Sequence, residues 1–347
     1  MPYANFRKFV FCVPTACTLV SQTDQNIRCV VCGWDPGDYP GPDVLGTEIT
    51  GHLATAVTNA DMRKRLTWLL VAIEHTIAAD RRNTPTPPGD TLRIFVVPEF
   101  YFRTTWEEQQ RGRDYTKKEF AELTGALSFY FDSYSRIHRC APLRDWLFLC
   151  GSCVHREPFF GWGSLVNEMV RVYIDGEACR SIKTIQKMCT SSIDGIYPVE
   201  DWNAMAAAVQ FVDPVRLNHH YMHAQGVFVE ICLEHRTFAA ASSRYLPGVR
   251  VNVLSAAGMP FDDGEVLAPS RWYLRADGML QNSPLFMVDS FMTDAIGRIP
   301  PNRRSGAVVG AVCSFHTWRN FDPATMGFPG FQLMGRANFV PVVFVML

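Results

Sequence analysis

Three side chains that could take part in covalent chemistry each stand at the end of an apolar run. Glu99 follows "RIFVVP", Lys187 ends "TIQK", and Cys232 closes "GVFVEIC". A carboxylate shielded from water holds its proton more tightly, which makes Glu99 a candidate acid or base. A cysteine thiolate is a strong nucleophile, and an ammonium can stabilise developing negative charge.

Each of these residues also has an ordinary structural explanation. A buried cysteine is commonly a small apolar core residue, and a charge at the end of a strand commonly marks the exit to solvent. The order glutamate, lysine, cysteine, with each residue closing an apolar run, is what favours a functional role. In α/β proteins, ligands collect at the ends of strands and in the loops that leave them.

The elements that would position these residues alternate between apolar strands and amphipathic helices. Apolar residues at intervals of three and four predict a helix from Met62 to Ile77, after a turn-rich loop. Thr116 and Glu119 form a possible capping box at the start of a second helix. Strands are predicted at the N-terminus and within 94–97, 145–152, 165–176, 179–188, 226–232, 249–255, 284–290 and 339–347. The turn at Asp175 and Gly176 predicts a hairpin.

This alternation indicates an α/β protein made of one continuous domain over residues 1–347. The segment 190–225 has no clear strand pattern and is predicted to be a loop or an insertion, and residues 331–347 form an apolar tail. The 33 basic and 34 acidic residues are not gathered into a basic stripe, which argues against nucleic acid or a membrane as partner. A small-molecule substrate is expected.

The eleven cysteines are an odd number in a chain much longer than small disulfide-dependent secreted domains. We therefore expect reduced thiols and a cytoplasmic location. Arg7 and Lys8 before "FVFCVPTACTLV" loosely imitate a secretory signal, but Pro14 and Thr15 interrupt the apolar run. A first buried strand is the preferred interpretation of this segment.

Taken together, these motifs resemble the nitrilase superfamily of carbon–nitrogen hydrolases over roughly residues 5 to 290. The family's glutamate in a Pro-Glu context matches "VVPEF", and its strand ending in Gly-Ser matches "LFLCGS". Its Asn-containing strand matches "VNEMVRVYIDG", with Asn167 and Gly176, and its cysteine segment matches "GVFVEICLEHR", with Cys232 and Glu234. Downstream, "SRWYLRADGMLQNSPLFMVDS" resembles a family helix followed by a strand, with matches at Trp272, Arg275, Ala276 and Asn282.

The resemblance leaves two candidates for the family's lysine. Counting from Asn167, the family spacing falls between Lys183 and Lys187, and we prefer Lys187 because an apolar residue lies two positions before it. The family often carries a second glutamate shortly after the lysine, and Asp194 is the nearest match. The connection from the lysine to the cysteine is longer than usual in the family.

The resemblance implies a four-layer α-β-β-α sandwich that forms a homodimer or a higher homo-oligomer. It also implies a mechanism without metal or cofactor, in which Glu99 takes the thiol proton of Cys232 and the thiolate attacks the substrate carbon. Lys187 and the N–H of Leu233 stabilise the resulting oxyanion, an amine or ammonia leaves, and water hydrolyses the thioester. The expected activity is hydrolysis of a non-peptide C–N bond, with amides ahead of nitriles.

Other interpretations remain open at the level of the sequence. "CLEH" has the Cys-x-Glu-His order of many nitrile-acting members, but Leu233 stands where those usually have Trp. An acyltransferase would pass the same thioester to an amine, and a non-catalytic scaffold would carry a decayed hydrolase fold. His219 and His223, four residues apart, could instead share a helical face as metal ligands. There is no glutamate of the HExxH kind beside them, so an entrance or surface position is preferred.

Overall fold

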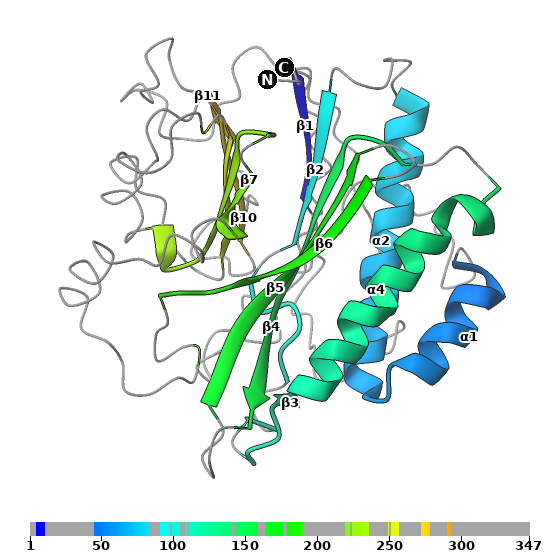
Figure 1. Cartoon of the computed structure of the whole chain (residues 1–347), viewed down its shortest axis with the longest axis vertical. Helices are drawn as coiled ribbons and strands as arrows, with labels where there is room; N and C mark the ends of the chain where they lie inside the picture. Colours follow the sequence, from blue (N-terminus) through cyan, green and yellow to red (C-terminus); the bar gives the residue numbers. More distant parts are fainter. Residues whose placement is uncertain are drawn as a thin grey trace, which may run out of the picture.

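A computed structural model gives the architecture of the chain and describes about half of its residues. The described residues are 5–10, 45–83, 91–97, 99–104, 108–109, 111–139, 143–158, 164–175, 179–189, 194, 219–222, 224–235, 249, 251–256, 272–277 and 290–292. They form a mixed α/β structure with two sheets and three long helices (Figure 1).

The first sheet contains the strands that lead to Glu99 and Lys187. Its path is β1-β2-β4-β5-β6, and the short strand β3 pairs with β4. β1, β2 and β4 run parallel to one another, whereas β5 and β6 are antiparallel neighbours. The strand bounds are Asn5–Val10 (β1), Thr91–Val96 (β2), Tyr115–Thr116 (β3), Trp146–Glu157 (β4), Ser164–Asp175 (β5) and Cys179–Gln186 (β6).

The second sheet contains the strand that leads to Cys232. Its order is β11-β10-β9-β8-β7, with β8, β9 and β10 parallel and the two edge strands antiparallel to their neighbours. The bounds are Tyr221–Met222 (β7), Val227–Ile231 (β8), Val251–Ala256 (β9), Trp272–Asp277 (β10) and Ser290–Met292 (β11).

The two sheets pack against each other through an apolar core. Successive side chains on a strand point to opposite faces of the sheet, so every second residue of a strand can enter this core. β2, β4, β5 and β6 contribute such residues from the first sheet, and β8 and β9 contribute them from the second. The core members are buried and aliphatic for the most part: Leu92, Ile94, Val96, Leu147, Leu149, Met169, Tyr173, Ile185, Met222, Val227, Val229, Ile231, Val251 and Val253. Figure 1 shows the two sheets side by side.

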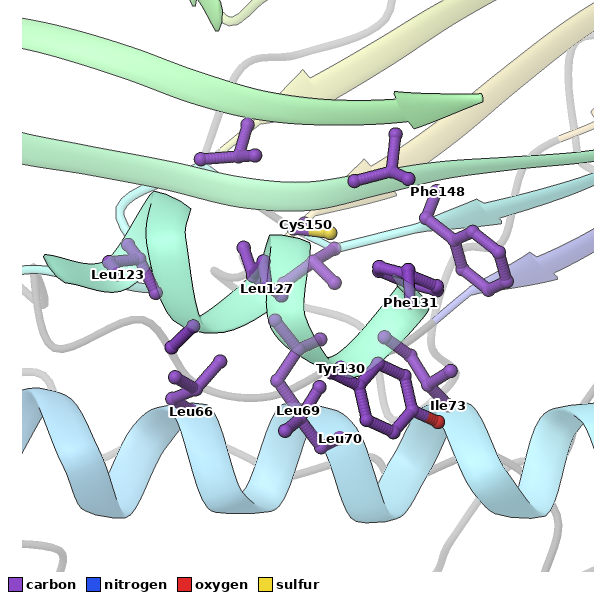
Figure 2. Packing of buried hydrophobic residues seen from close by; sticks show 14 of the residues in the cluster. Leu66, Leu69, Leu70, Ile73, Leu123, Leu127, Tyr130, Phe131, Phe148 and Cys150 are labelled. Carbon is purple, nitrogen blue, oxygen red and sulfur yellow. The ribbon is translucent and has the colours of Figure 1, made fainter. Parts of the chain in front are cut away.

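The opposite face of the first sheet is covered by the helices α2 (Ala60–Asn83) and α4 (Lys117–Ile137), and α1 (Gly46–Ala56) packs against both helices. Figure 2 shows the side chains that meet between α2, α4 and β4. The labelled residues, all buried, are Leu66, Leu69, Leu70 and Ile73 of α2, Leu123, Leu127, Tyr130 and Phe131 of α4, and Phe148 and Cys150 of β4. The described residues therefore supply a helical layer and two sheet layers.

Several local predictions are confirmed by these elements. The helix predicted from Met62 to Ile77 lies within α2, and Thr116 and Glu119 form the capping box of α4 with bonds in both directions. The predicted hairpin is the β5–β6 pair, in which Asp175 is opposite Cys179. The second helical layer of a four-layer sandwich is not found among the described residues and stays a prediction.

One expectation from the family resemblance is wrong. The segment beginning at Trp272 was expected to be helical, but Trp272–Asp277 is the strand β10. Its backbone is paired on both sides, parallel with β9 and antiparallel with β11, so the sheet supplies the hydrogen bonds that a helix would have made internally. Trp and Tyr at its start also favour a strand. Asn282 lies outside the described residues.

Other expectations fall wholly or mostly outside the described residues. The apolar tail at 331–347 is among them, and only Asp194 and the end of the predicted insertion at 190–225 are described. The single-domain organisation stays a prediction. None of the described helices is both long enough and apolar enough to cross a membrane.

Two substitutions in α4 should shift stability in opposite directions. Leu127 is buried, so Leu127→Ala should lower the free energy of unfolding by about 2–5 kcal/mol through the cavity that it leaves. Gly125 is exposed on the same helix, and a Cβ added there would meet no atom within 4 Å. Gly125→Ala should therefore raise the free energy of unfolding by about 0.5–1 kcal/mol. Urea unfolding of both variants measures this, and a loss of stability in Gly125→Ala would contradict the description of this helix face.

Candidate active site

Three strand ends bring the predicted residues into one region between the sheets. Glu99 follows β2, Lys187 follows β6, and Cys232 directly follows β8. The ammonium Nζ of Lys187 lies 2.7 Å from Oε1 of Glu99, and both side chains are buried. Lys183, the alternative lysine, is exposed and lies opposite Arg171 in the β5–β6 pair, away from this contact. The structure thus places Lys187 beside Glu99.

Asp194 completes the buried charge cluster. Both of its carboxylate oxygens lie 2.9 Å from Lys187 Nζ, and the residue is fully buried. The ammonium therefore donates to two carboxylates, those of Glu99 and Asp194. Sequence reasoning noted Asp194 as a possible equivalent of a second glutamate, and the structure brings it into direct contact with the lysine.

Asn167 of β5 ties the two carboxylates together. Its amide nitrogen Nδ2 donates to Glu99 Oε1 at 3.1 Å and to Asp194 Oδ1 at 2.9 Å. Its backbone oxygen accepts from the N–H of Lys187 at 2.8 Å, so one residue fixes the lysine backbone and both acidic side chains. The sequence marked Asn167 as a motif match without giving it a role, because an asparagine in a strand has no chemical signature of its own.

Cys232 stands at a strained turn at the end of β8. Its φ is 49°, in the left-handed region that non-glycine residues seldom adopt. The turn is held by the N–H of Cys232, which donates to Ser255 O at 2.8 Å, and by its carbonyl, which accepts from the N–H of His235 at 3.0 Å. Among the described cysteines Cys150, Cys153 and Cys189 are buried, whereas Cys232 is partly exposed.

Burial and the neighbouring charges set the protonation of the cluster. Burial raises the pKa of Glu99 to about 7, an effect that Lys187 opposes, that Asp194 reinforces, and that a hydrogen bond with the Cys232 thiol also opposes. Burial alone would lower the pKa of Lys187, but the charges of Asp194 and Glu99 and the nearby Cys232 raise it well above its ordinary value. The cluster therefore holds a permanent ammonium beside a carboxyl group that titrates near neutral pH.

The segment after Glu99 is held by contacts with the first sheet and with Lys187. Phe100 has a φ of 60°, and its N–H donates to Ser152 Oγ at 2.8 Å. The Phe100 ring lies 5.4 Å from Lys187 Nζ and 4.9 Å from the guanidinium carbon of Arg103. Such distances allow cation–π attraction, so the ring helps to hold the ammonium in place.

The histidine pair considered as a metal site is not assembled by the described residues. His219 is exposed, and His223 lies outside them. Within the described part of the chain, no three His, Cys, Asp or Glu side chains are grouped as metal ligands would be. The buried member of this segment is the intervening His220, which sequence reasoning did not single out.

Comparison with known proteins adds a distant structural likeness. No family model and no curated protein matches the chain. Among solved structures, the chain is similar to Saccharomyces cerevisiae Nit3, a member of branch 10 of the nitrilase superfamily. The identity is 13%, the match covers 68% of this chain and 79% of that chain, and the TM-score is 0.35.

The exposure of the thiols predicts which of them reacts first. Burial raises the pKa of Cys150 and Cys153 well above the ordinary range, so their thiolates are rare at neutral pH. Cys232 is partly exposed and interacts with the ammonium of Lys187. We expect brief treatment with iodoacetamide to label Cys232 ahead of the buried Cys150, Cys153 and Cys189, as peptide mapping would show. Faster labelling of a buried cysteine in the folded protein would contradict the site.

The buried carboxyl group also predicts a pH dependence of stability. The pKa of Glu99 is about 7 in the folded protein against an ordinary value of 4.5, so between these values the folded state binds the proton more tightly. The contribution of Glu99 to the free energy of unfolding should therefore fall as the pH rises from about 5 to about 8. Urea unfolding of wild type and Glu99→Gln over this range measures it. A difference between the two proteins that stays constant with pH would show that Glu99 does not titrate there.

Proposed function

We propose that the chain is a cysteine-dependent hydrolase of non-peptide C–N bonds in small molecules, of the nitrilase superfamily type, acting on amides. The observation that carries the proposal is the buried Glu99–Lys187–Asp194 cluster beside the partly exposed thiol of Cys232. In this proposal Glu99 is the titratable base, Lys187 the fixed ammonium and Cys232 the nucleophile of one site. The arrangement fits acyl transfer through a thioester.

Acylation begins with the proton of Cys232. Glu99 takes the thiol proton, and the thiolate sulfur forms a bond to the amide carbon, whose π electrons move to the oxygen. Lys187 stabilises the oxyanion, with the N–H of Leu233 as a second donor. Glu99 then gives its proton to the leaving nitrogen, the C–N bond breaks, and ammonia or an amine departs. A group whose pKa is near 7 suits both directions of this proton transfer.

Deacylation uses the same groups with water as the nucleophile. Glu99 takes a proton from water while the hydroxide forms a bond to the thioester carbon, and Lys187 again stabilises the oxyanion. The C–S bond breaks, the thiolate recovers the proton from Glu99, and a carboxylic acid is released. Each proton that Glu99 accepts is returned within the same half-reaction, so the cycle needs no metal or other co-reactant than water.

Asp194 and Asn167 support this cycle without entering it. Asp194 contributes a charge that keeps Lys187 protonated when Glu99 is neutral, so the ammonium persists through both states of the base. Asn167 donates to both carboxylates and so fixes their positions relative to each other. With both partners fixed, the ammonium needs little reorganisation when the oxyanion forms.

The burial of three charged side chains, those of Glu99, Lys187 and Asp194, argues against a non-catalytic scaffold. Taking a lysine and two acidic side chains out of water costs stability that apolar side chains of similar size would not cost. Retaining them beside a strained cysteine is consistent with catalysis. Leu233, which follows the nucleophile where many nitrile-acting relatives have Trp, favours amides over nitriles within the proposal. We further propose, from the sequence alone, a four-layer sandwich, a homodimer and a cytoplasmic location.

The proposal is tested by separating the roles of the nucleophile and the base. Ammonia release from a panel of amides, nitriles and carbamoyl compounds first identifies a substrate. With that substrate, Cys232→Ala should show neither turnover nor a covalent adduct, since the attachment point is gone. Glu99→Gln should slow turnover by about a hundred- to ten-thousand-fold and accumulate an acyl adduct on Cys232, because hydrolysis of the thioester loses its base.

Intact-mass spectrometry of the variants after incubation with substrate detects this adduct. Lys183→Met serves as the control, because Lys183 is exposed and lies outside the cluster, and it should leave turnover unchanged. Turnover of Glu99→Gln at the wild-type rate would show that Glu99 is an ordinary charge at a strand end, and turnover by Cys232→Ala would rule out the thioester.

A further inference from the structure

Another buried carboxylate, that of Glu234, joins the backbone beside Lys187 to the backbone beside Cys232. Oε1 of Glu234 accepts from the N–H of Met188 at 2.6 Å, and Oε2 accepts from the N–H of Ile231 at 2.7 Å. Met188 follows Lys187 directly, and Ile231 precedes Cys232 directly. Glu234 is fully buried. Because each of its oxygens accepts from one strand end, the side chain bridges the strand end that carries Lys187 and the strand end that carries Cys232.

His220 contacts the same two strand ends from their carbonyl side. Its Nδ1 lies 2.8 Å from Val229 O, and its Nε2 lies 3.2 Å from Gln186 O. Nδ1 is also 3.6 Å from Glu234 Oε2, so the two side chains are neighbours. Both side chains therefore contact the same two segments of backbone: 186–188, which contains Lys187, and 229–231, which ends next to Cys232. Glu234 accepts from one N–H group of each segment, and His220 faces one C=O group of each.

These segments belong to different sheets, which is why a bridge matters. β6 is in the first sheet and β8 in the second, so no ladder of backbone hydrogen bonds joins them directly. Their relative position depends on apolar packing between the sheet faces, which has no directional preference, and on side chains that hydrogen-bond to both. A shift of about 1 Å at a reacting group is enough to lower a rate by two orders of magnitude.

We propose that Glu234 is a positioning residue that sets the separation of Lys187 and Cys232, with His220 as its support. This inference rests on the proposed function. Glu234 acts through the backbone, because each of its oxygens is engaged by an amide of one strand end. Replacing the carboxylate by an amide would set an NH₂ group against one of these two N–H donors. The strand ends would separate, and the ammonium would move away from the thiol.

The reactivity of Cys232 reports this geometry without any substrate. We would measure the rate of alkylation of Cys232 by iodoacetamide against pH in wild type, Glu234→Gln and Glu230→Gln. Burial raises the pKa of Glu234 to about 8, and the hydrogen bonds from the two backbone amides oppose this shift. The profile therefore has to extend above about pH 8, where the side chain is the carboxylate that both amides bond.

Glu230→Gln is the matched control. Glu230, on β8, is also fully buried and also contacts a histidine, His235, at 3.0 Å, but its carboxylate is not bonded to Met188 or Ile231. We expect Glu234→Gln to slow alkylation above about pH 8 by about tenfold and to move the midpoint of the profile up by about one pH unit, the equivalent of about 1.4 kcal/mol. Glu230→Gln should stay within about twofold of wild type, because the Glu230 carboxylate contacts His235 and does not join the two strand ends.

A folded Glu234→Gln protein, checked by circular dichroism, with the wild-type profile would overturn the inference, as would an equal change in Glu230→Gln. If Glu234→Gln does not fold, hydrogen exchange of the wild-type protein decides. The amides of Met188 and Ile231 should be protected and should exchange together, since one carboxylate holds both, and unprotected or independently exchanging amides would overturn the proposal. Failure to find any hydrolysed substrate would count against the proposed function alone, because alkylation needs none.

Discussion

The burial of the Lys187 ammonium between two carboxylates is the interaction on which the rest of the site depends. An isolated buried ammonium would lose its proton, but Asp194 and Glu99 keep it charged. Two carboxylates facing one ammonium leave one excess negative charge among buried side chains, and burial disfavours that charge. The consequence is a pKa of about 7 for Glu99, so the cluster that keeps the lysine charged also contains a carboxyl group that titrates near neutral pH.

This cluster demands a particular arrangement of the two sheets. Glu99 and Lys187 follow strands of the first sheet and Cys232 follows a strand of the second, so the three side chains meet only if the two sheet faces pack in one relative position. Phe100 and Cys232, next to or within the cluster, both have positive φ, at a cost of about 1–3 kcal/mol each. The apolar core between the sheets, with its many fully buried aliphatic residues, offsets this cost and keeps the strained turns in place.

Local sequence patterns predicted the parts of the fold that are governed by local physics. The periodicity of α2, the capping box of α4 and the β5–β6 hairpin each depend on residues within a few positions of one another. The preference for Lys187 over Lys183 also came from local context. The helix α1 was missed, because "GTEITGHLATA" contains two glycines and three threonines and buries only Ile49 and Leu53 inside the helix, so its apolar pattern is weak. β10 was mistaken for a helix because its strand character depends on β9 and β11.

The contacts that complete the site could not be predicted for the same reason. Asp194 is seven residues from Lys187, Asn167 is 68 residues from Glu99, and Glu234 is 46 residues from Met188. Each contact exists only once the strands have packed, and the residue types involved are common in loops and on surfaces. A sequence can therefore indicate the nucleophile, base and lysine by type and order, whereas the residues that hold them in place depend on the tertiary structure.

These tertiary contacts give the two carboxylate oxygens of Glu99 different surroundings. Oε1 accepts both from Lys187 Nζ and from Asn167 Nδ2, so its lone pairs are engaged. Oε2 is buried and accepts no hydrogen bond of ordinary geometry from the described residues, while the Cys232 thiol interacts with the same carboxylate. In the proposed mechanism, the proton that leaves the thiol is accepted by Oε2, and it can be passed on without breaking the hydrogen bond between Oε1 and Lys187. The contacts of Oε1 fix the position of the carboxyl group, and the proposal assigns proton transfer to the other oxygen.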